Sequence, residues 1–209
     1  MHRIIGWPSG ERVSASYSDC QRVVSRCGKL RYQFRVTEEE ALAQFCTSDG
    51  KTIADCSRAS DVLLVFLRHE GCTFCREALA DLAEKRSALE AAGTRLVIVH
   101  MSSDSGFRVL TDKYGLPDVP LVSDPERTLY QALGLRRASW WEMLSPHIWW
   151  KGFRAALIAG HGFGGIRGDA FQMPGIFLIR EGRVIAKHLH RDASERPDYL
   201  EVCALPTRL

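Results

Sequence analysis

The feature that most constrains the fold of this 209-residue chain is the alternation of buried strands and helices over residues 61–135. Residues 61–69 read DVLLVFLRH, a continuous apolar run typical of a strand covered on both faces. The segments predicted to follow it alternate in type: helix 71–93, strand 94–101, helix 103–116, strand 119–125 and helix 126–135. This order predicts an α/β fold of parallel βαβ units, with right-handed crossovers placing helices on both faces of one sheet.

The segment before this region is patterned more weakly. Residues 36–45 predict a short helix capped by Thr37, with Glu40 three residues on as a capping box. Within residues 45–53, Asp49-Gly50 predicts a hairpin turn. We therefore place an N-terminal extension at residues 1–44 and the domain at residues 45–209.

The chain after residue 135 first departs from the alternation of strands and helices and then returns to regular elements. Residues 138–168 hold four of the five tryptophans, and we expect a Trp-rich helical insertion there. The tryptophans either line an apolar substrate pocket or partner surface, or pack an inserted helix pair onto the domain. The remaining predicted elements are two strands joined by a tight turn and a closing helix with Pro197 in its first turn: 173–179, 184–190 and 193–205.

Composition and charge exclude several classes of protein. Hydrophobic residues make up 45% and charged residues 25% of the chain, which indicates a globular protein. The net charge is +3, but acidic and basic residues alternate, as in REALADLAEKR, so we expect no nucleic-acid partner. We also expect no membrane span and no secretory leader, since no apolar run approaches 18 residues. Seven cysteines in such a chain favour a reducing, cytoplasmic location.

The strongest chemical signal is Cys72-Thr73-Phe74-Cys75, which follows a predicted strand and begins a predicted helix. This context is typical of a thioredoxin-like redox site, because the N-terminus of a helix stabilises a thiolate. Arg68 and Arg76 add positive potential nearby, and Glu70 opposes it. We expect Cys72 to be the exposed nucleophile and Cys75 to be the resolving thiol. The alternatives are half of a zinc site or two inert core cysteines, and no second CxxC or CxxH accompanies the pair.

A second signal is Met173-Pro174-Gly175, directly before a predicted strand. In thioredoxin-like folds a cis-proline loop lies against the CxxC at this point of the chain order. We therefore expect Pro174 to be cis and to support the active site. The alternative is a trans proline at the start of a strand.

Three segments together resemble a known family: LLVFLRHEGCTFCREALADL, VPLVSDPERTLYQALGL and GDAFQMPGIFLIREGRVI. Residues 45–203 resemble the peroxiredoxin-like branch of the alkyl hydroperoxide reductase/thiol-specific antioxidant (AhpC/TSA) group, which includes prostamide/prostaglandin F synthases and selenoprotein L. The resemblance implies a thioredoxin-like fold with a central mixed sheet flanked by helices. It also implies a thiol-dependent oxidoreductase that reduces a peroxide, endoperoxide or disulfide, needs no cofactor or metal, and is recycled by a thioredoxin- or glutaredoxin-like electron donor.

The sequence also departs from typical peroxiredoxins. If Cys75 is aligned with the peroxidatic cysteine, Cys72 occupies the position of a Thr or Ser hydroxyl, and Pro174 stands near the usual arginine. This favours a dithiol mechanism, with the two cysteine roles exchanged if the peroxiredoxin alignment governs. The rival hypothesis is a non-enzymatic redox-sensing or protein-interaction module that uses the Trp-rich insertion. A homodimer is compatible with either.

The other conspicuous residues favour structural roles. Gly160 to Gly165 match G-x-G-x-x-G, but no strand precedes them, so we expect a loop and not a dinucleotide site. His69 either supports the thiolate or caps the strand end in solvent. We expect His188 and His190 to be structural or exposed, with no accompanying carboxylate. The other cysteines are interpreted as bystanders: Cys20, Cys27, Cys46, Cys56 and Cys203.

Overall fold

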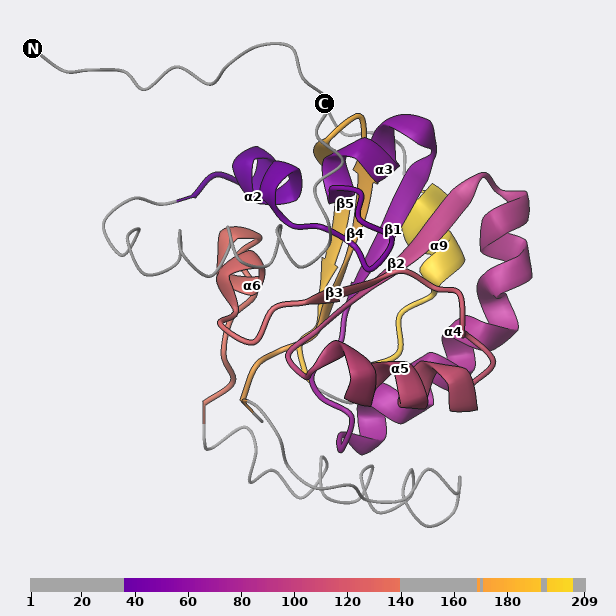
Figure 1. Ribbon diagram of the computed structural model, residues 1–209, viewed down its shortest axis with the longest axis vertical. Helices are drawn as coiled ribbons and strands as arrows, with labels where there is room; N and C mark the ends of the chain where they lie inside the picture. The colour runs from indigo at the N-terminus through magenta and orange to yellow at the C-terminus, as the bar shows by residue number, and fades with distance from the viewer. Residues whose placement is uncertain (1–35, 140–168, 170, 193–194, 205–209) are drawn as a thin grey trace, which may run out of the picture.

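The computed structural model describes residues 36–139, 169, 171–192 and 195–204 of the chain. Its centre is one five-stranded sheet with the strand order β3-β2-β1-β4-β5 (Figure 1). The strands span the following residues: β1 Asp61–Phe66, β2 Thr94–His100, β3 Leu121–Ser123, β4 Gly175–Arg180 and β5 Arg183–Leu189. β1 is parallel to β2, β2 is parallel to β3, and the remaining pairs are antiparallel. The predicted mixed sheet is therefore confirmed.

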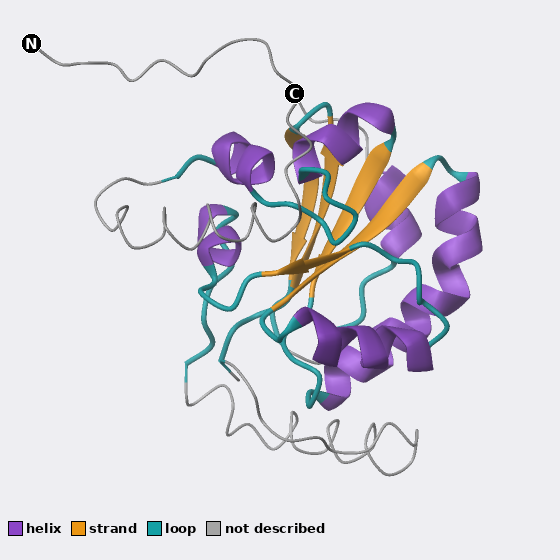
Figure 2. Cartoon of the chain, in the orientation of Figure 1, coloured by secondary structure: helices purple, strands orange, loops and turns teal. Residues whose placement is uncertain are grey.

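Helices cover both faces of this sheet (Figure 2). One face is covered by α2 (Glu38–Gln44), α3 (Ile53–Ala59) and α6 (Thr128–Ala132). The other is covered by α4 (Thr73–Ala91), α5 (Asp104–Lys113) and α9 (Tyr199–Ala204). Successive side chains of a strand point to opposite faces, so the apolar run of β1 supplies both cores.

The side chains of β1 show this division directly. Val62, Leu64 and Phe66 lie in the core beneath α2, α3 and α6, whereas Leu63 and Val65 lie in the core beneath α4, α5 and α9. All five side chains are at most 2% exposed. The strand is thus buried on both faces, as its unbroken apolar sequence predicts.

The N-terminal elements differ in part from the prediction. The capping box of Thr37 and Glu40 is present at the start of α2. Ala41 and Leu42 of this helix are fully buried in the core, so the fold includes residues upstream of the expected domain start at residue 45. The Asp49-Gly50 turn joins only an isolated antiparallel bridge, because Thr52 caps a helix, α3, that the sequence pattern did not indicate.

The C-terminal elements are confirmed in type, with one correction. α9 begins at Tyr199, so Pro197 precedes the helix and does not lie in its first turn. The Asp198 carboxylate instead accepts a hydrogen bond from the Leu200 amide at 3.0 Å. The expected Trp-rich insertion lies mainly in residues 140–168, outside the described residues. Its flanks are adjacent, since the Ala138 amide donates to the Phe171 carbonyl at 2.7 Å.

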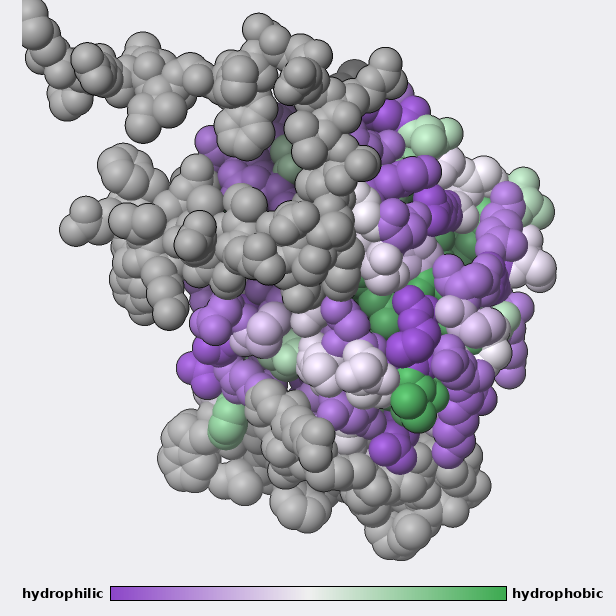
Figure 3. All heavy atoms as spheres, in the orientation of Figure 1, coloured by the Kyte–Doolittle hydropathy of each residue, from purple (hydrophilic) through white to green (hydrophobic). Residues whose placement is uncertain are grey.

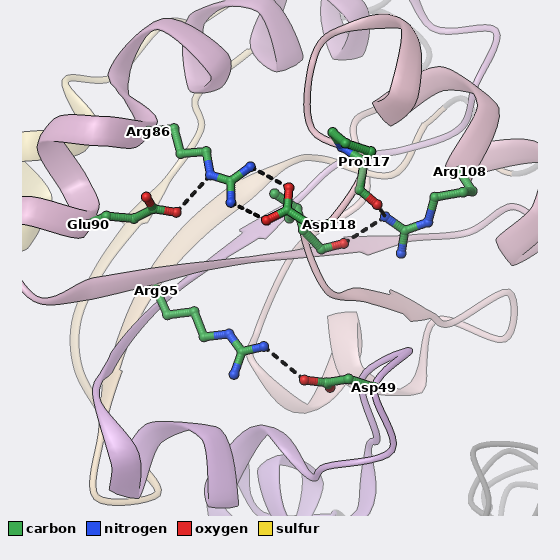
Figure 4. Close-up of polar contacts among 8 residues, drawn as sticks. Asp49, Arg86, Glu90, Arg95, Arg108, Pro117 and Asp118 are labelled. Atoms are coloured by element: carbon green, nitrogen blue, oxygen red, sulfur yellow. Dashed lines mark hydrogen bonds and ion pairs between the residues drawn. The ribbon is translucent and has the colours of Figure 1, made fainter.

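Charged side chains tie α4 and α5 to the loop that leads into β3 (Figure 4). Arg86 of α4 donates to Glu90 at 2.7 Å and to Asp118 at 2.6 Å. Arg108 of α5 donates to the Pro117 carbonyl at 2.8 Å. Exposed ion pairs contribute at most about 1 kcal/mol each, so these contacts chiefly fix the path of the loop.

The described surface is mostly polar. The face in Figure 3 is largely hydrophilic outside the grey residues, with small separate hydrophobic patches. Among the described residues, the large hydrophobic side chains that are strongly exposed are Val109 and Leu189. No helix within the described ranges is both long and apolar enough to cross a membrane.

Candidate active site

The two cysteines of the CxxC motif lie at the N-terminus of α4, the helix that follows β1 in the chain. Cys72 is the N-cap residue of α4, and its sulfur accepts a hydrogen bond from the Cys75 amide at 3.4 Å. Both side chains are free thiols. Cys72 is 5% exposed and Cys75 is 3% exposed. The expectation of an exposed Cys72 is therefore wrong for the reduced pair, whose Cys72 sulfur is in contact with the Arg68 side chain.

Arg68 contacts both sulfur atoms. Its guanidinium Nη2 donates to Cys72 Sγ at 2.9 Å, and its backbone amide donates to Cys75 Sγ at 3.2 Å. The residue is only 6% exposed. Its backbone is held beside β2, since the Arg68 carbonyl accepts from the Met101 amide at 2.9 Å. A fixed, buried cation beside a helix N-terminus stabilises an anion there.

These contacts give the two thiols opposite acidities. Burial alone would raise the pKa of Cys72, but the hydrogen bond from the Cys75 thiol and the charge of Arg68 hold that pKa well below its ordinary value. Burial and the neighbouring Cys72 sulfur raise the pKa of Cys75 well above its ordinary value. The pair is therefore arranged as a thiolate at Cys72 and a thiol at Cys75. A thiolate is the nucleophilic form of cysteine.

Three further predicted support residues, Thr73, Phe74 and Arg76, lie in the first turn of α4. Thr73 is the buried first residue of α4. Phe74 packs against the core beneath α4, and its carbonyl accepts from Arg196 Nη1 at 3.3 Å. Arg76 Nε donates to the Glu70 carbonyl at 3.1 Å.

His69 and Glu70 are placed by the same loop. His69 is 4% exposed and its carbonyl accepts from the Cys72 amide at 3.0 Å, so it does not cap the strand in solvent. Burial lowers the pKa of the His69 imidazole. The Glu70 carboxylate accepts a hydrogen bond from the Ser102 hydroxyl. This bond directs the carboxylate toward the loop after β2.

Pro174 lies at the same end of the sheet as the cysteines. Gly175 is the register partner of Phe66, the last residue of β1, so Pro174 lies beside the segment that leads to Arg68. The described residues contain no cis peptide bond, and the prediction of a cis Pro174 is wrong. The loop runs extended into β4, with the Met173 amide donating to the Arg136 carbonyl at 3.1 Å. The Met173–Pro174 peptide bond is therefore trans, the isomer that is intrinsically favoured.

A cavity of about 240 Å³ borders the Pro174 loop. Its walls combine apolar side chains, such as Leu135 and Met173, with His190 and Arg191. His190 is the residue directly after β5, so the cavity opens at the same end of the sheet as the cysteine pair.

The two histidines near the end of β5 differ from the prediction. A carboxylate does accompany them, since Glu195 Oε1 lies 3.0 Å from His188 Nε2. Glu195 reaches this position across the turn after β5, a contact that strand alternation alone does not indicate. The ring centroids of His188 and His190 lie 5.5 Å apart. Within the described ranges, no three His, Cys, Asp or Glu side chains are grouped so that they could hold a metal ion.

The remaining described cysteines lack the environment of Cys72. Burial raises the pKa of the Cys56 thiol and of the Cys203 thiol. Cys46 is disulfide-bonded and offers no free thiol. Of the free described thiols, Cys72 is therefore the one whose pKa is lowered.

Tyr130 of α6 was not predicted to belong to the site. It is fully buried, and its hydroxyl donates to the Leu67 carbonyl, one residue before Arg68. The contact joins residues 63 positions apart in the sequence. The only local signal is that Tyr130 follows the S-D-P turn whose Asp124 caps α6.

The comparisons with known proteins agree with this fold. Residues 81–192 match the model of the AhpC/TSA antioxidant enzyme family, a match that begins after the cysteine pair. Human peroxiredoxin-like 2C is 31% identical over 146 residues, which cover 65% of this chain and 62% of that protein. The thioredoxin-like protein AAED1, chloroplastic, of Arabidopsis thaliana is 30% identical over 39% of this chain and 32% of its own length. The chain thus spans less than two thirds of these relatives.

Two solved structures share the fold. A cysteine-to-serine mutant of peroxiredoxin Q from Xanthomonas campestris has a TM-score of 0.51 at 16% identity, covering 72% of this chain and 82% of its own. Reduced Prx3 from Vibrio vulnificus, solved in complex with H2O2, has a TM-score of 0.52 at 16% identity, covering 73% and 84%. At such identities the likeness concerns the fold alone.

Proposed function

The chain belongs to the AhpC/TSA antioxidant enzyme family, and from this premise we propose that it is a thiol-dependent oxidoreductase that cycles Cys72 and Cys75 between dithiol and disulfide. The observation that carries the proposal is the 2.9 Å contact between Arg68 Nη2 and Cys72 Sγ at the N-terminus of α4. A buried thiolate needs such a fixed positive partner. The substrate proposed is a small-molecule peroxide, endoperoxide or disulfide.

The first step with a peroxide is an attack by the Cys72 thiolate. The sulfur bonds to the terminal oxygen, the O–O bond breaks, and the departing alkoxide takes a proton and leaves as an alcohol. Cys72 is oxidised to a sulfenic acid and the peroxide is reduced by two electrons. Arg68 lies beside this sulfur before the attack.

The second step closes the disulfide. The Cys75 sulfur attacks the Cys72 sulfur, the S–O bond breaks, and the hydroxyl group leaves as water with the proton of the Cys75 thiol. With a disulfide substrate, Cys72 instead forms a mixed disulfide and Cys75 displaces the second thiol. One turn of helix separates the two cysteines, which is the separation this closure needs.

An external dithiol completes the cycle. A thioredoxin- or glutaredoxin-like donor gives two electrons to the Cys72–Cys75 disulfide and becomes oxidised itself. This chemistry requires neither a metal nor an organic cofactor. We propose the cytoplasm, because the four described free thiols favour a reducing compartment and outweigh the disulfide at Cys46.

The acidities favour Cys72 as the nucleophile. The pKa of Cys72 is lowered and that of Cys75 is raised, which supports the assignment made from the order of the CxxC. The exchanged roles suggested by the peroxiredoxin alignment would require Cys75 to react first. The two single serine variants distinguish these assignments.

The test is stopped-flow oxidation of the reduced protein by hydrogen peroxide, read by intact mass and peptide mapping. We expect rapid loss of two hydrogens located to Cys72–Cys75. Cys75→Ser should stop at the sulfenic acid, and Cys72→Ser should remain unreactive. Cys56→Ser is the matched control, because Cys56 is also a buried free thiol but its pKa is raised.

Two results would change this assignment. Rapid oxidation of Cys72→Ser together with an inert Cys75→Ser would exchange the cysteine roles. Oxidation no faster than that of a free thiol would exclude a peroxidase. Disulfide and endoperoxide substrates would then be assayed, and failure with all of them would favour the non-enzymatic redox-sensing module.

A further inference from the structure

Tyr130 is held in a fixed position beneath the active-site loop. Its ring is fully buried and contacts Phe66 edge-on, with ring centroids 4.8 Å apart. The helix that carries it is capped by the Asp124 carboxylate, which accepts from the Leu129 amide at 2.8 Å and from the Tyr130 amide at 3.3 Å. The hydroxyl therefore reaches the Leu67 carbonyl from a rigid support.

The Leu67–Arg68 peptide group has partners on both sides. Its carbonyl accepts from the Tyr130 hydroxyl, and its N–H donates to Cys75 Sγ at 3.2 Å. The C=O and N–H of a trans peptide point in opposite directions. One peptide group thus connects α6 on one face of the sheet with the cysteine pair on the other.

Hydrogen bonds in such a chain strengthen one another. A donor to the carbonyl polarises the peptide and makes its N–H a better donor, the more so in a buried, weakly screened site. The N–H of Arg68 faces a sulfur that must become an anion in order to react. Any added polarisation therefore favours the anionic form of that sulfur.

We propose that Tyr130 is a positioning residue for the resolving cysteine, acting through the Leu67–Arg68 peptide to stabilise the Cys75 thiolate. This inference rests on the proposed dithiol cycle. The side chain of Arg68 then serves the Cys72 sulfur, while its backbone N–H, strengthened by Tyr130, serves the Cys75 sulfur.

The resolving step is where this support matters. Burial and the adjacent Cys72 sulfur raise the pKa of Cys75, so its thiolate is scarce. Cys75 must nevertheless attack the sulfenic sulfur of Cys72, forming the S–S bond as water leaves. A stronger N–H donor increases the thiolate population and hence the rate of closure.

The first measurement is the Cys75 pKa in the full chain, by NMR of ¹³C-labelled cysteine in a Cys72→Ser background. Tyr130→Phe keeps the ring and removes only the hydroxyl. We expect the pKa of Cys75 to rise by about 0.1 to 0.7 unit, since cooperativity strengthens a hydrogen bond to a charged group by roughly 10–30%. Tyr114→Phe is the control, because Tyr114 is a half-buried tyrosine at the C-terminal end of α5 that packs against the same core as Cys75.

A second variant tests the opposite direction. Replacing Tyr130 by a fluorotyrosine makes the phenol a stronger donor without removing it. The Cys75 pKa should then fall below that of the parent. The Cys75 pKa of the fluorotyrosine protein also tests the proposal if Tyr130→Phe fails to fold.

The kinetic measurement separates the two steps in the protein with both cysteines. After one equivalent of hydrogen peroxide, Tyr130→Phe should form the sulfenic acid at the parent rate and close the disulfide more slowly, by up to about twofold. Its closure rate should also rise at a higher pH than in the parent protein. A structural defect alone would slow both steps or neither.

The outcomes remain distinguishable. If the parent protein forms no Cys72–Cys75 disulfide, the proposed function fails, and the NMR comparison still decides the role of Tyr130. A Cys75 pKa that is the same in the parent, Tyr130→Phe and fluorotyrosine proteins would overturn the inference. An equal shift in Tyr114→Phe would overturn it as well.

Discussion

Arg68→Gln removes the buried cation beside Cys72 while keeping a polar side chain of similar reach. Arg68 Nη2 lies 2.9 Å from Cys72 Sγ, and both residues are at most 6% exposed. A hydrogen bond to a charged group contributes about 1.5–3 kcal/mol. One pKa unit corresponds to about 1.4 kcal/mol. The pKa of Cys72 should therefore rise by about one to two units.

The effect on rate is smaller than the effect on acidity. A rise of about one to two pKa units lowers the thiolate fraction about tenfold to a hundredfold at a pH well below the pKa. A more basic thiolate is, however, a better nucleophile, and this recovers roughly half of the loss on a logarithmic scale. The rate constant of Cys72 with a thiol reagent should thus fall about threefold to tenfold.

The assay is alkylation by iodoacetamide across a pH series, with the modified cysteine identified by mass spectrometry. The midpoint of the Cys72 profile should move to higher pH in Arg68→Gln. Arg76→Gln is the control, because the Arg76 side chain donates to the Glu70 carbonyl, and its profile should move less. An unchanged midpoint in Arg68→Gln would refute the reasoning and leave the α4 N-terminus as the main source of thiolate stability.

Two further changes test the surroundings of the site. Burial lowers the pKa of His190 from 6.5 to about 4. As the pH falls, this histidine therefore takes up a proton in the unfolded state before it does so in the folded state. Its contribution to the free energy of unfolding is present above about pH 6.5 and is lost as the pH falls toward 4. The loss should reach at most about 3 kcal/mol by urea unfolding, and a loss of equal size in His190→Asn would contradict the assignment. A Cβ on Gly175 would lie 2.6 Å from Leu135 Cδ2, so Gly175→Ala should lower the free energy of unfolding by about 1–3 kcal/mol, whereas an unchanged value would show that Leu135 moves aside freely.

Much of the fold follows from local sequence signals. The apolar run of residues 61–69, the helix after Cys72 and the Thr37 capping box are confirmed, because each depends on side chains within a few positions of one another. The same locality places the CxxC at a helix N-terminus, where orphan N–H groups favour a thiolate. The nearness of Arg68 to the cysteine pair was also expected from sequence alone.

Other features depend on contacts that sequence spacing does not encode. The helix α3 was missed because its residues follow a turn signal that is also typical of a hairpin. The chain order of a CxxC and a later proline does not encode the isomer of Pro174, and the partner of His188 is a glutamate across a turn.

The candidate active site shows the same division between sequence and tertiary structure. The sequence by itself determined the alternation of strands and helices, the cysteine pair and the charge beside it, since these are properties of neighbouring residues. Only the tertiary structure decided that Arg68 uses its side chain for Cys72 and its backbone for Cys75. It also brought Tyr130 to the Leu67 carbonyl across 63 residues, because hydrogen bonds between distant residues form only once both faces of the sheet are packed.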